Sequence, residues 1–113
     1  MTEIRTYDGD FSFKILPREK ADQLDDLFAE GGFEVDIALQ SLEFSWMGRD
    51  PEGRILKLFI AAALILQDAE GELRCEIDDD QPDPHFEFFT IKQGHLLLQR
   101  GKLVRESELI PQV

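Results

Sequence analysis

The only cysteine in the chain, Cys75, is the residue best suited by type to act as a nucleophile. Leu73 and Ile77 lie at the alternate positions on either side, so a strand would point the thiol toward an apolar face. A reactive thiolate needs a cationic and partly exposed setting, whereas Arg74 would point to the other face. We therefore predict that Cys75 fills the core, and the sequence identifies no catalytic residue.

A group of carboxylates with one imidazole, within residues 78–85, has the side chains typical of a metal site. Oxygen and imidazole ligands could hold a divalent cation. The spacing does not match the calcium-binding loop, which needs a central glycine and a distal glutamate. A solvated acidic loop is the favoured interpretation, and we predict neither a metal nor another cofactor. The candidate ligands, were a metal to bind, are Asp78, Asp80, Asp83 and His85.

Histidine is by type suited to general acid–base chemistry, so His85 and His95 could serve as general bases. Nothing in the sequence places either of them beside a nucleophile. The glycines form neither a phosphate-binding loop nor a dinucleotide fingerprint, and no nucleophile-elbow motif is present. The sequence therefore leaves the question of catalysis open but favours a non-enzymatic role.

Charge is the strongest signal in the composition. The 24 acidic and 12 basic residues give a formal net charge of −12. A field of this sign repels nucleic-acid phosphates and anionic membranes, so we predict binding to neither. It attracts basic partners, although solubility alone would also account for it.

The charges are also unevenly distributed along the chain. Residues 68–87 contain nine acids and one base, and residues 92–105 contain four bases and no acid. Opposite charges of this kind can pair between subunits, or they can neutralise each other across neighbouring strands of one chain.

The sequence predicts a single cytoplasmic domain spanning residues 1–113. Its N-terminus does not resemble a secretory signal. Its longest apolar run, residues 58–66, is much shorter than the roughly 20 residues of a membrane helix. A lone cysteine cannot form an internal disulfide, which suits a reducing compartment.

The first half of the chain contains the clearest helix. Residues 4–16 resemble a hairpin with a turn at Asp8-Gly9. Pro17 then opens an amphipathic helix over about 17–30 that stops at Gly31-Gly32. Residues 33–47 alternate as a strand with a bulge at Gln40-Ser41, but they also fit a helical face.

The apolar segment at residues 54–67 could be a central strand or a buried helix. Its alanines favour a helix. A turn at residues 68–71 and the alternation of residues 72–77 suggest a hairpin, and a hairpin needs a strand before it. We therefore favour the strand.

The remaining elements are predicted to be strands. Residues 78–84 form a loop, and residues 86–92 and 94–105 form two or three strands with turns at Gln93-Gly94 and Arg100-Gly101. Residues 107–113 form a frayed tail. The sum is an α+β fold: a mainly antiparallel, meander-like sheet of five to eight strands with one helix packed on it.

Apolar side chains exceed what one helix can shield. The segment 86–91 places apolar residues on both strand faces, so the sheet must curl on itself or meet a second chain. The candidate partner-binding residues are Phe86, Phe88, Phe89 and Leu97.

The leading interpretation is a small acidic protein-binding or regulatory module that acts without catalysis and can form a homodimer. In one variant, the acids of residues 68–87 imitate nucleic-acid phosphates toward a basic protein. The alternative is a ligand-binding or catalytic domain with a pocket inside a curled sheet. Candidate lining residues for that pocket are Tyr7, Phe44, Trp46 and His85.

Overall fold

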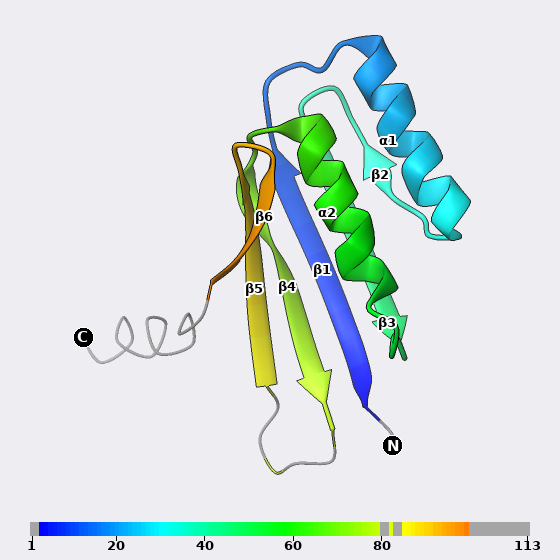
Figure 1. Ribbon diagram of the computed structural model, residues 1–113, viewed down its shortest axis with the longest axis vertical. Coiled ribbons are helices and arrows are strands. Elements are labelled where there is room, and N and C mark those ends of the chain that lie inside the picture. The colour runs from blue at the N-terminus through cyan, green and yellow to red at the C-terminus, as the bar shows by residue number, and fades with distance from the viewer. Residues whose placement is uncertain (1–2, 80–81, 83–84, 100–113) are drawn as a thin grey trace, which may run out of the picture.

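The computed structural model describes residues 3–79, 82 and 85–99, which form one sheet and two helices. The strands are β1 (Ile4–Ser12), β2 (Asp36–Ile37), β3 (Ser41–Gly48), β4 (Glu70–Asp78), β5 (His85–Lys92) and β6 (His95–Gln99), and the helices are α1 (Arg18–Gly31) and α2 (Arg54–Leu66). Figure 1 shows this arrangement. The predicted α+β class and antiparallel sheet are confirmed, with two helices where we expected one.

The six strands pair in the order β2-β3-β1-β4-β5-β6, and every pairing is antiparallel. Strand β1 lies in the middle, between β3 and β4. Helix α2 connects β3 to β4 and so passes over β1. Only the run from β4 to β6 is the simple meander that the sequence suggested.

The predicted hairpin over residues 4–16 is wrong, because β1 runs straight through Asp8 and Gly9. Gly9 is needed for packing and not for a turn. A Cβ at this position would lie 3.2 Å from Leu73 Cδ1, 3.4 Å from Phe44 Cβ and 3.6 Å from Phe59 Cζ. The missing side chain lets the Phe59 ring of α2 approach the central strand.

Helix α1 forms where the amphipathic pattern predicted it. Pro17 precedes its first turn, and Gly32 ends it in the left-handed conformation with φ 82°. Leu24 and Phe28 are buried against the sheet.

Residues 33–48 form a short hairpin, which settles the ambiguity between strand and helix. Strands β2 and β3 pair directly, and the N–H of Ala38 donates to the carbonyl of Ser41 at 2.8 Å. The change of alternation at Gln40-Ser41 is therefore the end of this turn and not a bulge.

Residues 54–66 form helix α2, so the predicted strand is wrong. The N–H groups of Arg54 and Ile55 donate to the two carboxylate oxygens of Asp50, each at 2.9 Å. These N–H groups belong to the unpaired first turn of the helix, so Asp50 caps it. We expected the strand after residues 68–71 to need a strand before it as its hairpin partner. Instead β4 pairs with β1 and β5, so no strand is needed at residues 54–66.

Both helices cover the same face of the sheet, and the core lies between the two layers. It is made largely of phenylalanine: the Phe28, Phe44 and Phe59 ring centroids lie 5.2 to 5.7 Å apart. The sheet also curls so that β6 reaches α2, and the N–H of Gly94 donates to the carbonyl of Gln67 at 2.7 Å.

Several predicted features fall outside the residues that the structure describes. These are the turn at Arg100-Gly101, the tail at 107–113 and most of the loop between β4 and β5. Among the helices of the described residues, none has the length and hydropathy that crossing a membrane requires.

We predict that Asp50→Ala lowers the free energy of unfolding by about 1 kcal/mol, because two N–H groups of α2 lose their acceptor. Asp50→Ser retains a capping oxygen and is expected to lose much less. Urea denaturation of both variants and the unmodified chain measures the difference. Equal stability of all three proteins would contradict the assignment of Asp50 as the cap.

Candidate functional site

Cys75 is buried with no exposed surface, as its position in the alternation predicted. Burial raises the pKa of its thiol, and the hydrogen bond with Tyr7 offsets only part of this increase. A thiol that is both enclosed and held protonated is a poor nucleophile.

Cys75 lies beside a small polar group at one end of the helix-covered face. Arg5 donates to Glu3 at 2.6 Å and to the Tyr7 hydroxyl at 3.3 Å, and its guanidinium lies 3.9 Å from Glu87. Two carboxylates and a phenol thus surround the Arg5 guanidinium. These partners compensate the cost of partly burying its charge.

The candidate metal ligands do not form a metal site among the residues described. Asp78 ends β4, His85 begins β5, and Asp80 and Asp83 lie outside the described residues. His85 Nε2 lies 3.7 Å from a carboxylate oxygen of Asp79. No group of three or more metal-binding side chains occurs in the described ranges.

The residues proposed to line an internal pocket are not arranged around one. Tyr7 and Phe44 are core residues, and the Trp46 ring packs 6.4 Å from Tyr7 and 5.8 Å from Phe33. The side chain of His85 is 60% exposed at the sheet end. Aromatic rings fill the space between sheet and helices, so the alternative interpretation gains no support from these residues.

The four candidate partner-binding residues divide between the two faces of the sheet. Phe89 is in the helix-covered core, whereas Phe86, Phe88 and Leu97 point to the opposite side. Phe86 and Phe88 stack with centroids 6.4 Å apart. Leu97 is 41% exposed.

This opposite side, which we call the open face, carries a row of carboxylates across four neighbouring strands. Asp36 of β2 pairs with Glu43 of β3, Glu43 with Asp10 of β1, and Asp10 with Glu72 of β4. Directly opposed residues of antiparallel strands have Cβ atoms about 5 Å apart on the same face. We call these four residues the acidic row.

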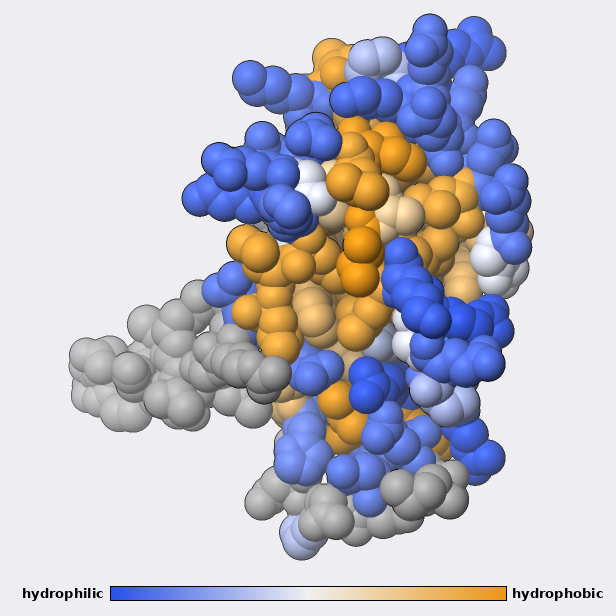
Figure 2. Space-filling model, viewed as in Figure 1, coloured by the Kyte–Doolittle hydropathy of each residue, from blue (hydrophilic) through white to orange (hydrophobic). Residues whose placement is uncertain are grey.

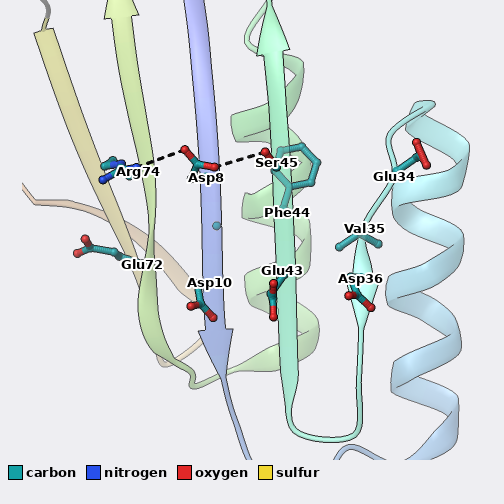
Figure 3. A pocket seen from close by; sticks show the side chains of 11 residues that line it. Asp8, Asp10, Glu34, Val35, Asp36, Glu43, Phe44, Ser45, Glu72 and Arg74 are labelled. Carbon is teal, nitrogen blue, oxygen red and sulfur yellow. Dashed lines mark hydrogen bonds and ion pairs between the residues drawn. The ribbon is translucent and has the colours of Figure 1, made fainter.

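The acidic row lies in an open groove of about 670 Å³, shown in Figure 3. The groove is bounded by β1, β3, β4 and the segment that leads into β2. Among its described lining residues, Asp8 and Glu34 add two further carboxylates, and Arg74 is the only base.

Arg74 does not lie in the acidic row but beside it. It pairs with Asp8 across the strands, with its guanidinium 3.4 Å from the Asp8 carboxylate, and Asp8 in turn accepts from Ser45 at 3.4 Å. The neighbouring Asp10 has Glu43 and Glu72 as its opposed residues. Like charges directly opposed destabilise a sheet, so the pairs of Glu43 with Asp36 and with Asp10 oppose the stability of their own strands.

No local sequence pattern indicates this row. Its members stand at positions 10, 36, 43 and 72, and only the strand register brings them together. The expected acidic segment, residues 68–87, contributes one member.

Comparison with protein-family models, with curated proteins and with solved structures finds no match. The interpretation of the open face therefore depends on its own geometry and charge.

We predict that Asp10→Asn stabilises the protein by about 0.5 kcal/mol at low salt, because it relieves the like-charge contact with Glu43. Asp8→Asn, on the same strand and face, is the matched control. It should lower stability, since Asp8 opposes Arg74. The free energies of unfolding at low and high salt measure both effects, which should shrink as salt screens them. Loss of stability in Asp10→Asn at low salt would contradict the repulsion.

We predict that the free energy of unfolding falls as the pH rises above the ordinary thiol pKa of 9.0. The folded-state pKa of Cys75 is raised, so the unfolded chain releases this proton first. The stabilising contribution is complete below the unfolded value and is lost as the pH rises through the folded value. Denaturation at a series of alkaline pH values should show a shallower decline for Cys75→Ala. An identical pH dependence in both proteins would rule out this linkage.

Proposed function

We propose that this protein is a cytoplasmic, non-enzymatic binding module whose acidic row receives a basic helix of a partner protein. The observation that carries the proposal is the alignment of four carboxylates on directly paired residues of four strands. The helices occupy the other face, so the row is accessible to a partner.

Charge supports a basic partner. The chain has a net charge of −12, and the groove around the row holds six carboxylates and one guanidinium among its described lining residues. Such a surface speeds the association of cationic proteins and selects against anionic ones. The cross-strand repulsion within the row would be relieved when cations approach, so binding would recover stability that the free protein lacks.

The spacing of the row favours a helix over an extended segment. Neighbouring strands lie about 4.8 Å apart. Residues three or four apart on one helix face are separated by about 4.5–6 Å along the axis, whereas same-side residues of an extended chain lie about 6.8 Å apart. A helix lying across the strands could therefore bring successive cations near successive carboxylates.

Apolar side chains elsewhere on the open face suit an amphipathic partner. Met47 is 70% exposed at one end of β3, and Leu97 is 41% exposed on β6. Both lie on the open face, together with Phe86. This proposal modifies the phosphate-imitation idea, because the relevant carboxylates come from four strands and not from residues 68–87 alone.

We predict binding of a synthetic alanine-based helical peptide with lysines at every third or fourth position along one face. Affinity, measured by calorimetry, should fall steeply as salt is added. A peptide of the same composition with its lysines distributed around the helix should bind more weakly. The double substitution Asp10→Asn, Glu43→Gln should weaken binding of the first peptide about tenfold or more at low salt.

The matched control is Asp22→Asn, Asp25→Asn, which removes the same charge from the exposed surface of α1. It should leave binding nearly unchanged. Equal weakening by the two double variants would mean that only net charge matters. Equal binding of the two peptides would mean that the spacing of the lysines does not matter. Either result would overturn the proposed role of the row.

A further inference from the structure

Helix α2 is apolar on the side that faces away from the core as well as on the side that faces into it. Ile60 and Leu64 are 53% and 62% exposed. They lie one turn apart and so share one face of the helix. Figure 2 shows hydrophobic residues gathered over the position of α2, with hydrophilic residues around them. A helix that is hydrophobic all round is normally buried all round.

The exposed side of α2 forms a continuous stripe. Residues spaced by three or four positions along it are half-buried or exposed. We call them the outer stripe: Leu56, Lys57, Ile60, Leu64 and Gln67. Helix α1 differs, because its outer surface is rich in carboxylates.

We propose that the outer stripe is the contact between two copies of this chain, packed with their α2 helices antiparallel about a two-fold axis. In this arrangement Ile60 of each copy meets Leu64 of the other. A two-fold contact must be self-complementary, and an apolar stripe with Lys57 near one end and Asp68 just beyond the other meets that requirement.

Charge supports a second copy in this place. Each copy carries a net charge of −12, so two copies repel over most of their surfaces. Helix α2 contains no acidic residue and two bases, Arg54 and Lys57. Among the helices and strands described, it therefore offers a face on which carboxylates of two copies do not meet.

Charge also selects the antiparallel direction. Lys57 lies near the start of α2, and the exposed Asp68 follows its end. Antiparallel packing centred between Ile60 and Leu64 brings Lys57 of each copy near Gln67 and Asp68 of the other, which forms two opposite-charge contacts. Parallel packing would oppose Lys57 to Lys57.

The area of the stripe indicates a moderate affinity. A stable interface needs about 800 Å² from each partner, and one side of a 13-residue helix supplies less. The half-buried Leu96 and Leu98 belong to β6, which contacts α2, and can extend the patch. We expect dissociation in the micromolar range.

The proposal does not depend on the proposed function, because the stripe and the acidic row lie on opposite sides of the sheet. Sedimentation equilibrium of the full chain, without any partner, tests it. The mass should rise with concentration from 13.0 kDa toward twice that value. Leu64→Glu should weaken association about tenfold or more, because it places a charge in the apolar contact. Leu39→Glu is the matched control: Leu39 is 75% exposed, lies between β2 and β3, and should not matter.

A charge exchange tests the direction of packing. Lys57→Glu should weaken the dimer, and adding Gln67→Lys should restore much of the loss, with circular dichroism confirming that each variant is folded; Asp68 is left unchanged because its carboxylate accepts from the Gln93 N–H at 3.0 Å. A chain that is monomeric at all concentrations would overturn the proposal and leave the stripe to another occupant. A dimer that is insensitive to Leu64→Glu would place the contact elsewhere, and failure of the exchange to restore association would overturn the antiparallel arrangement.

Discussion

The fold depends on a junction of three phenylalanine rings, one from each helix and one from the sheet. Phe28 of α1, Phe44 of β3 and Phe59 of α2 contact one another in pairs. Rings of this size dominate the burial of apolar surface in a small core. Gly9 lies beneath Phe59 and lets α2 settle close to β1. The junction therefore holds both helices on one face of the sheet.

The helices cover only one face of the sheet, and this explains why the acidic row on the other face is tolerated. The carboxylates of the open face remain accessible to water, where a pair of like charges costs a fraction of a kcal/mol and not several. The same residues on the helix-covered face would each need a partner, as Arg5 has in Glu3 and Glu87. The acidic row therefore lowers the stability of the fold only slightly, but it does not contribute to it. Residues that weaken their own sheet are better explained by an interaction outside it than by folding.

Local patterns predicted those elements whose two sides differ in polarity. Helix α1 and strand β4 were expected for this reason, and so was the inward direction of Cys75. Helix α2 was missed because an apolar residue at nearly every position has no period to read. Asp50, four residues before the helix, was the available signal for its start. The acidic row could not be predicted, because it exists only once β2, β3, β1 and β4 are in register.

The two surfaces lie on opposite sides of the molecule, yet charge links them. Association through α2 brings together two chains with a net charge of −12 each. The repulsion between them opposes the apolar contact. A basic helix bound at the acidic row of each copy would reduce that repulsion without touching α2. Binding and self-association would then strengthen each other, since a coupling free energy between two sites acts equally in both directions. The size of this coupling would fall with added salt, because salt screens the repulsion between the two chains.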